Sequence, residues 1–464
     1  MPEFLFSRAF RRVAGLTPVL LVSAALALDA RATGAQSSHP GAVDVMTLRD
    51  VFDSIRSNNP VLRAASAHVR VARAGLSSAR TWSNPVLTVE NDQMSEQMPG
   101  LTAPQGETMT TAMLPLEPFY QRGPRIERAR ALVRAGEADV LTQRQRLALD
   151  AGDVFYDVAL AQVNVTATRS LAQWFDTVVT YNRVRVREGV TAEADLIRSE
   201  LERDHVLNEL AMAESELARA EADLQTLTRA RPGDAEIPVD VDSLPLNLDS
   251  TVFARRAVQQ PARAQRIGAD TSETVTLISR PDVEGARQRF LASEAATASE
   301  RRMFLRELGV MVGAKTSGGS SSLVTGLTLP FPLFDQNRGN IGAARAERDA
   351  ARFDLELEQR RAAADLWSAE KAARILSQRV LAFGRGGAGY LGRAEEARRI
   401  ALGAYREGGT TLLQVIDAAR AWREARSSYF ETLFAQHRAV IRLLVAEGVD
   451  VLDAWPENRS GAIQ

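Results

Sequence analysis

One event in the sequence constrains the fold more than any other. A short β-prone run ends at prolines, and a very long helical pattern follows. In the first half Leu114-Pro115-Leu116-Glu117-Pro118 leads into 124–187, and in the second half Leu329-Pro330-Phe331-Pro332 leads into 340–406. Neither helical pattern contains an internal proline, which would break it. The chain therefore predicts a strand that turns into a long helix, twice.

The turns that end the two long patterns also match. Arg187-Glu188-Gly189-Val190-Thr191 ends the first, and Arg406-Glu407-Gly408-Gly409-Thr410 ends the second. Further helices are predicted after these turns, over 192–227 and 412–446. Within 192–227 the apolar residues alternate in steps of four and three, a heptad seam that requires a partner helix. The seam residues are Val206, Leu210, Ala213, Leu217, Ala220, Leu224 and Leu227.

The predicted organisation is an internal two-fold repeat behind a signal peptide. Arg8, Arg11 and Arg12 precede a mainly apolar run, which is typical of a secretory signal, and an uncleaved membrane anchor is the alternative. Each repeat reads as helix, hairpin, long helix, turn and long helix. The predicted ranges are a signal peptide at 1–35; a first repeat at 36–230, with hairpin 86–114 and long helices 124–187 and 192–227; a connector at 231–279; a second repeat at 280–447, with hairpin 308–329 and long helices 340–406 and 412–446; and a polar tail at 448–464.

The first helix and the connector have clear local signals. Thr47 is a predicted N-cap, and the helical stripe that follows is broken at Asn58-Asn59-Pro60 before it continues to about Trp82. The connector contains several prolines and aspartates and loses the helical period.

Composition excludes several classes of function. Charged residues make up 25% of the chain and the net charge is −1, so no nucleic-acid surface is expected. There is no cysteine, hence no disulfide and no thiolate metal site. The four histidines, His39, His68, His205 and His437, are isolated from one another, and we expect each to be a solvated helix position rather than a metal ligand.

No catalytic or cofactor-binding motif emerges. The run Gly384-Arg385-Gly386-Gly387-Ala388-Gly389 lacks the Gly-Lys-Ser/Thr ending of a phosphate-binding loop, and a bend in the helix is the predicted role. We therefore expect no catalytic residue, no cofactor and no bound metal.

The strand count predicts an oligomer. Each repeat supplies two strands, and the resulting four cannot close a barrel or leave an open edge in lipid. Three copies supply twelve, so a homotrimer forming one twelve-stranded outer-membrane β-barrel is the smallest solution. The expected fold is mainly α with a small β part, in which long antiparallel coiled-coil helices continue from the barrel as an α-barrel.

The chain resembles the TolC-type outer-membrane efflux family over essentially all of its mature length. The resemblance is carried by Thr47-Leu48 with Asn59-Pro60, by Arg280-Pro281-Asp282, and by the passage from Leu329 to Gly339. Within that passage Asp335-Gln336-Asn337-Arg338-Gly339 most resembles the cobalt-zinc-cadmium type heavy-metal branch. The resemblance implies a conduit in the outer membrane of a Gram-negative bacterium that docks to a periplasmic adaptor and an inner-membrane RND-type pump. Some members carry a lipidated N-terminal cysteine, which this sequence lacks.

The resemblance also implies a periplasmic aperture at the second helical turn. The family commonly has two acidic residues three apart there, whereas this sequence has Gln414 and Asp417, which would halve the charge of a carboxylate ring. The family's link between a tyrosine and an aspartate of the other hairpin corresponds to Tyr405 and Asp195. The alternative is that Asp195 and Asp417 only cap or solvate helix starts.

The glycine-containing turns are predicted adaptor contacts, because small residues leave grooves in which a partner hairpin can pack. These contact residues are Gly189, Val190, Thr191, Gly408, Gly409 and Thr410. The barrel-to-helix joint is assigned to Pro115, Pro330, Pro332 and Gly339, where prolines end strand pairing and Gly339 turns the chain into the helix.

Two other classes of protein fit the sequence less well. A periplasmic coiled-coil adaptor or scaffold without its own pore would carry long β-domains rather than two short hairpins, and an exported enzyme would need a candidate site. The transported substrate is not encoded here, because the pump selects it. The predicted function is an outer-membrane channel that passively conducts heavy-metal cations or drugs.

Overall fold

The computed structural model describes residues 46–92, 106–228, 280–303, 308–329, 333–383 and 389–455. All of them belong to one compact unit, Asp44–Gln464, separate from Met1–Val43. The predicted signal peptide and the whole connector, 231–279, lie outside the described residues, as do Pro330, Pro332 and 384–388 of the glycine run.

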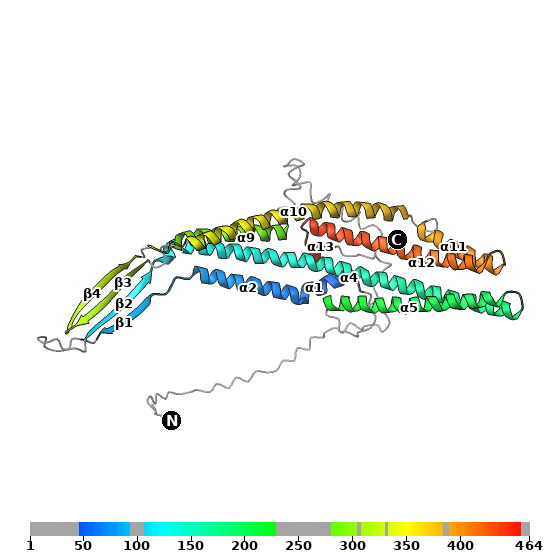
Figure 1. The fold of residues 1–464 in the computed structure, drawn as a ribbon, viewed down its shortest axis with the longest axis horizontal. Helices are drawn as coiled ribbons and strands as arrows, with labels where there is room; N and C mark the ends of the chain where they lie inside the picture. Colours follow the sequence, from blue (N-terminus) through cyan, green and yellow to red (C-terminus); the bar gives the residue numbers. More distant parts are fainter. Residues whose placement is uncertain are drawn as a thin grey trace, which may run out of the picture. The chain divides into compact units, whose positions relative to one another are not determined.

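Four antiparallel strands form one sheet in the order β1-β2-β3-β4 (Figure 1). They are β1 (Val86–Asp92), β2 (Glu107–Pro115), β3 (Gly309–Ser317) and β4 (Ser320–Thr328). The two predicted hairpins are present and are joined through β2 and β3, so residues far apart in sequence pair directly, as Thr110 does with Ala314. The β3–β4 turn has positive φ at both Gly318 and Gly319, as a tight two-residue hairpin turn requires.

The first helical group begins as the sequence signals indicate. Its helices are α1 (Leu48–Asn58), α2 (Pro60–Arg80), α3 (Glu117–Tyr120), α4 (Arg122–Arg187) and α5 (Glu193–Leu227). Thr47 and Asp50 form a capping box at α1, and Asn59 caps α2, whose first residue is Pro60. Helix α2 ends at Arg80, two residues before the expected end.

The second group differs from the prediction in its long helix and at its C-terminal end. Its helices are α9 (Pro281–Arg302), α10 (Arg338–Phe383), α11 (Tyr390–Arg406), α12 (Leu412–Ala446) and α13 (Val451–Ala454). The expectation of one helix over 340–406 is wrong: α10 ends at Phe383, and α11 begins after Gly389, whose backbone is extended. An extended residue cannot continue the i to i−4 hydrogen-bond ladder, so two helices result.

Helix α4 packs against α2, α5, α9 and α12. The predicted heptad seam of α5 finds its partner in α4, and its residues Val206, Ala220 and Leu224 are buried. The expectation that the 448–464 segment is only a polar tail is wrong, because Val451 and Leu452 of α13 are buried in the core that contains Phe52. Apolar side chains offset the cost of ordering this last turn.

The histidine prediction fails at one position. His437 of α12 is fully buried, with its ring centroid 5.3 Å from that of Tyr156. Its neighbours Phe434 and Val440 are also buried, so the apolar face of α12 includes this position. His68 and His205 are exposed as expected.

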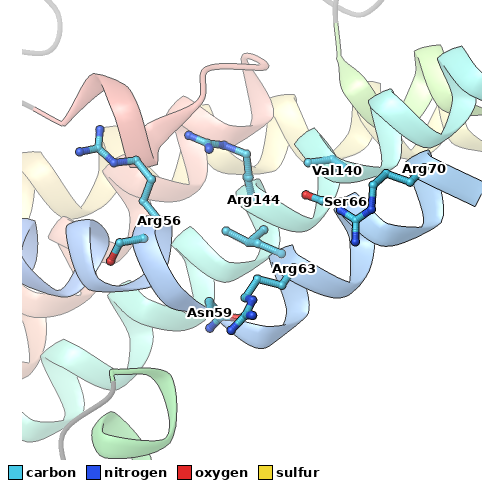
Figure 2. Close-up of a pocket in the computed structure, with 9 residues that line it drawn as sticks. Arg56, Asn59, Arg63, Ser66, Arg70, Val140 and Arg144 are labelled. Carbon is cyan, nitrogen blue, oxygen red and sulfur yellow. The ribbon is translucent and has the colours of Figure 1, made fainter. Parts of the chain in front are cut away.

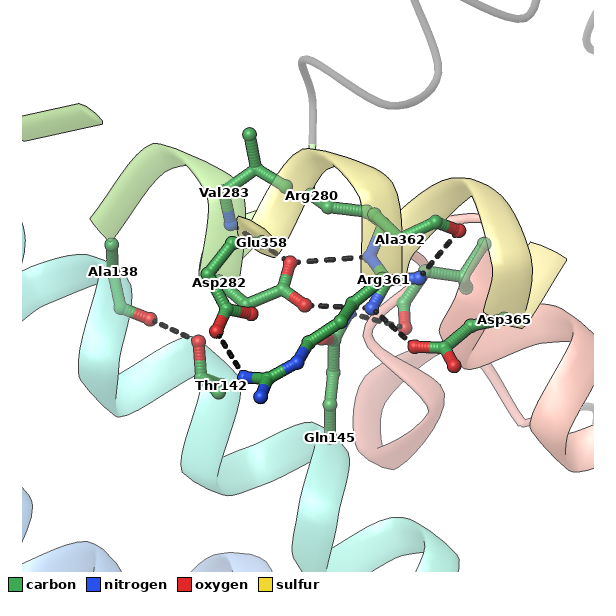
Figure 3. A network of polar contacts seen from close by, with 11 residues as sticks. Ala138, Thr142, Gln145, Arg280, Asp282, Val283, Glu358, Arg361, Ala362 and Asp365 are labelled. Carbon is green, nitrogen blue, oxygen red and sulfur yellow. Dashed lines mark hydrogen bonds and ion pairs between the residues drawn. The ribbon is translucent and has the colours of Figure 1, made fainter. Parts of the chain in front are cut away.

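Arg280 ties the start of α9 to the middle of α10 (Figure 3). Its guanidinium donates to both carboxylate oxygens of Asp282, at 3.1 and 2.6 Å, and lies 3.3 Å from Asp365. It also donates to the Ala362 carbonyl at 3.3 Å. A nearly buried guanidinium is tolerated because carboxylates and a carbonyl satisfy it. The Arg-Pro-Asp motif is thus a clamp that sets the register of α9 on α10.

None of the helices in the described ranges has the length and hydropathy to span a membrane.

Candidate functional site

The two helix-to-helix turns have the same backbone. After α4, Gly189 N–H donates to Val186 O at 3.1 Å and Val190 N–H to Arg185 O at 2.9 Å. After α11, Gly408 N–H donates to Tyr405 O at 3.1 Å and Gly409 N–H to Ala404 O at 2.8 Å. Both turns are Schellman motifs, and the αL residue is a glycine in each, with φ of 70° at Gly189 and 79° at Gly408. The positive φ at Gly189 and Gly408 is sufficient to explain why both positions are glycine, whether or not an adaptor contacts them.

The ends of α4 and α11 are joined by a cluster around Tyr405. This residue is 4% exposed, and its hydroxyl donates to Oδ1 of Asn182 at 2.7 Å. Tyr181, one residue earlier on α4, donates to the Arg406 carbonyl at 3.1 Å. The guanidinium of Arg185 lies 5.5 Å from the Tyr181 ring centroid and 5.9 Å from that of Tyr405. The cluster holds the two helical hairpins together in the last turns of α4 and α11, immediately before the helix-to-helix turns.

The predicted hydrogen bond between Tyr405 and Asp195 is wrong. The Asp195 carboxylate instead accepts from the Thr191 hydroxyl, at 3.5 Å, in the first turn of α5. This agrees with the alternative, in which a carboxylate stabilises a helix start. Asn182 is fully buried at the α4–α11 contact, and its Oδ1 accepts the tyrosine hydroxyl, whereas its Nδ2 has no hydrogen-bond partner among the described residues. Burial raises the pKa of Tyr405 above its ordinary value; the Asn182 bond and Arg185 oppose the shift, and the charge of Asp195 adds to it.

Sequence reasoning missed Tyr181, Asn182 and Arg185. The aromatic and basic residues in the last turns of α4 were visible, but the burial of Asn182 follows only from how α11 packs. No local pattern marks that position.

Gln414 and Asp417 lie on one exposed face of α12. They are three positions apart, so they are neighbours on the helix surface, and both are exposed. The Gln414 side chain accepts from the Thr410 hydroxyl, and its backbone N–H donates to the Thr411 hydroxyl that caps α12. Gln414 is thus engaged in its own turn, whereas Asp417 presents a carboxylate to solvent. In the described part of the chain, no group of three or more His, Asp or Glu side chains is placed to hold a metal ion.

At the opposite end of the helices, Asn337 is the residue that turns the chain into α10. It has a φ of 56°, the only non-glycine residue with positive φ in the described ranges. Its side-chain amide donates to the carbonyl of Glu300 and to the Glu300 carboxylate, both at 2.9 Å. The assignment of this turn to Gly339 is wrong, because Gly339 lies inside α10. Asparagine tolerates the left-handed conformation, and here its side chain anchors the turn to α9. Pro115, by contrast, ends β2 as expected.

The sheet has two chemically different faces. Directly paired residues of antiparallel strands share a face, so the register assigns every strand residue to one side. One side carries seven exposed large apolar side chains, namely Leu87, Val89, Leu114, Val310, Val312, Leu323 and Leu327. The other side carries every charged residue of the strands, namely Glu90, Asp92, Glu107 and Lys315, together with the exposed Val86 at the start of β1.

The pairing stops at β1 and β4, which are both edge strands. An uncovered apolar face and two open edges do not suit a sheet in water.

Comparison with known proteins identifies the family. Residues 51–228 match the family model described as "Outer membrane efflux protein". Residues 51–228 therefore form a domain of the outer membrane efflux protein family. The resemblance seen in the sequence is confirmed.

Among curated relatives of this efflux-family chain is the "Cobalt-zinc-cadmium resistance protein CzcC" of Cupriavidus metallidurans, 26% identical over 85% of this chain and 88% of its own length. The "Nickel and cobalt resistance protein CnrC" of the same organism is 27% identical over 67% of this chain and 71% of its own length. Among solved structures, CusC superposes with a TM-score of 0.68 at 20% identity, covering 87% of this chain and 92% of that one. The structural likeness shows that the fold is shared.

Proposed function

We propose that this chain is the outer-membrane channel of a tripartite efflux system, which passively conducts heavy-metal cations or drugs from a pump and adaptor complex across the outer membrane. The observation that carries the proposal is the division of the sheet into an apolar and a charged face. The apolar face suits outer-membrane lipid, and the charged face suits an aqueous lumen.

The working unit in this proposal is a homotrimer. The outer edges of β1 and β4 have backbone groups that a further strand could pair with, and one chain has too few strands to enclose a lumen. Three copies joined edge to edge give a twelve-stranded barrel in which no edge is left open.

Exposed apolar side chains on the helices support the same assembly. On α10, Phe353, Trp367 and Ile375 are 58%, 63% and 54% exposed. On α5, Leu201 and Met212 are 65% and 73% exposed. Neighbouring copies would cover these faces and continue the barrel as an α-barrel reaching into the periplasm.

The helical turns are the proposed docking and gating end. The adaptor would pack on Gly189, Val190 and Thr191 and on the corresponding residues Gly408 to Thr410. The two turns share one backbone conformation, which also supports the internal two-fold repeat. The aperture would be lined by Gln414 and Asp417, and its latch would be the bond from Tyr405 to Asn182.

The proposed substrates are heavy-metal cations first and drugs second. The relatives named above are called resistance proteins for cobalt, zinc, cadmium and nickel, which favours divalent cations and an RND-type pump. The substrate itself would be chosen by the pump.

Cell fractionation with unheated electrophoresis tests the proposal directly. We expect a heat-modifiable trimer in the outer-membrane fraction that forms channels in a planar bilayer. A soluble monomer would overturn the channel and favour the scaffold alternative. The double variant Trp367→Asp/Ile375→Asp places charges on the exposed apolar face of α10 and should prevent trimer formation. The variant Arg374→Gln on the same helix should still form the trimer.

A second test addresses docking. Replacing Gly189 or Gly408 with tryptophan should abolish zinc, cobalt and cadmium resistance in a complemented deletion strain while the trimer still assembles. Normal resistance in both variants would remove the turns from the docking surface.

A further inference from the structure

A basic cavity lies at the corner between α1 and α2, against α4 (Figure 2). Its volume is about 390 Å³. Arg56, Arg63, Arg70 and Arg144 line it, and no carboxylate does. The cavity is remote from the helical turns and from the sheet, so the proposed channel function assigns it no role.

Two of the four guanidiniums are already neutralised. Arg144 pairs with Asp450 and Asp453, both at 2.7 Å. Arg56 pairs with Asp53 at 3.1 Å and with Asp453 at 3.3 Å. These ion pairs hold the Arg56 and Arg144 side chains in place at the cavity, and they contribute little net charge to it.

The other two guanidiniums have no carboxylate partner among the described residues. Arg63 and Arg70 are exposed on α2, a helix that contains no acidic residue. By contrast, Arg73 of the same helix reaches Glu137 of α4 at 2.8 Å. The cavity therefore retains the charge of Arg63 and Arg70.

Asn59 adds an amide donor. This residue is 5% exposed, and its Oδ1 accepts from Val61 N–H at 2.9 Å to cap α2. That bond fixes the orientation of the amide, and its NH₂ group has no hydrogen-bond partner within the described ranges. Figure 2 shows Asn59 and Arg63 next to each other at the cavity. The first turn of a helix also favours negative charge.

We propose that this corner binds an anion that carries two or more phosphate or carboxylate groups. Arg63 and Arg70 are seven residues apart, a rise of about 10 Å along the helix, so a ligand with separated charges fits better than a single phosphate. Arginine forks bind both phosphate and carboxylate oxygens. Asn59 and the exposed Ser66 would supply neutral contacts.

The ligand is a soluble anion rather than a lipid headgroup. Helix α2 is about 30 Å long, with the cavity at its Pro60 end and β1 beyond its Arg80 end. The exclusion of a lipid headgroup rests on the proposed channel function, in which only the sheet lies in lipid. The cationic cavity itself does not depend on it.

Titration calorimetry of the purified full-length protein in neutral detergent tests the site, with sodium tripolyphosphate, citrate and monophosphate as probes at fixed ionic strength. We expect one tripolyphosphate per chain, bound at least about tenfold tighter than monophosphate, with citrate between them. Arg63→Gln/Arg70→Gln should weaken tripolyphosphate binding by about a hundredfold, since each charged hydrogen bond accounts for about tenfold.

Matched variants keep the result interpretable. Arg130→Gln/Arg374→Gln removes the same charge from exposed helix positions outside the cavity and should bind as the parent does. Asn59→Asp retains a capping side chain but adds a negative charge, and it should abolish binding while the melting temperature is kept. Absence of saturable binding, equal loss in both double variants, or binding only to micelles doped with anionic phospholipid would each overturn the site. Trimer formation and conductance, measured on the same samples, report separately on the channel.

Discussion

The two long helices that leave the sheet, α4 and α10–α11, look alike in sequence and have different surroundings. Helix α4 runs unbroken for 66 residues and packs on several helices, so buried side chains recur along its whole length. Helix α10 spans 46 residues, packs on α9 and α12, and leaves Phe353, Trp367 and Ile375 largely exposed. Two similar sequence patterns can therefore specify a core helix, here α4, and a surface helix, here α10. Only the second of these can offer a wide apolar face to another copy.

The largest test of this contrast compares two phenylalanines. Phe155 of α4 is 1% exposed and Phe353 of α10 is 58% exposed. Phe155→Ala should lower the free energy of unfolding by about 3–5 kcal/mol, because it empties a packed site. Phe353→Ala should change the stability of the isolated chain by less than about 0.5 kcal/mol. Denaturation followed by circular dichroism measures both, and similar losses would erase the contrast.

The second-largest effect is expected at the residues that precede the two helices, Asn337 before α10 and Gln121 before α4. Asn337→Ala should cost about 2–4 kcal/mol, because alanine is strained at positive φ and two hydrogen bonds to Glu300 are lost. Asn337→Gly, which tolerates the conformation, should cost less. Gln121→Ala at the start of α4 should cost under about 1 kcal/mol, since its side-chain amide donates to the sulfur of Met303, which is a weak acceptor. Equal melting temperatures for all three would contradict the assignment of the turn.

The ends of α4 and α11 are linked by Tyr405. Tyr405→Phe should cost about 1–3 kcal/mol, because the fully buried Asn182 loses its donor. Tyr181→Phe, which removes a bond at a half-buried position, should cost less.

The link between α4 and α11 also predicts a pH effect. Burial raises the pKa of Tyr405, so the unfolded chain releases this proton first. The contribution of Tyr405 is complete below about pH 10 and is lost as the pH rises towards the folded value. Tyr405→Phe should flatten that alkaline decline, and an unchanged slope would exclude Tyr405 as its source.

The smallest effects are expected where the two helices are alike. Gly189→Ala and Gly408→Ala should each cost about 1 kcal/mol, equally, because both residues hold the αL position of the same motif. Gly403→Ala, inside α11 with no atom near the added methyl group, should instead stabilise by about 0.5–1 kcal/mol. Unequal costs at the two turns would break the symmetry described above.

Much of the fold was predictable because its signals are local. Thr47, Asn59-Pro60 and the glycine turns specify where helices begin and end, and Ser317-Gly318-Gly319-Ser320 specifies a hairpin. The heptad steps of α5 correctly required a partner helix. The candidate site was less predictable, since the partner of Tyr405 depends on which face of α4 meets α11.

The amino-acid sequence was sufficient to predict the two strand hairpins, the helix-to-helix turns at Gly189 and Gly408, and the family resemblance. These follow from periodicity, capping and turn chemistry, which act over a few residues. Only the tertiary structure decided that Asn182 rather than Asp195 receives Tyr405, that Asn337 rather than Gly339 turns the chain, and that His437 is buried. It also brought Arg63 and Arg70 to a cavity without carboxylates. The burial of Asn182, Asn337 and His437 depends on contacts between segments far apart in sequence, which local sequence patterns do not encode.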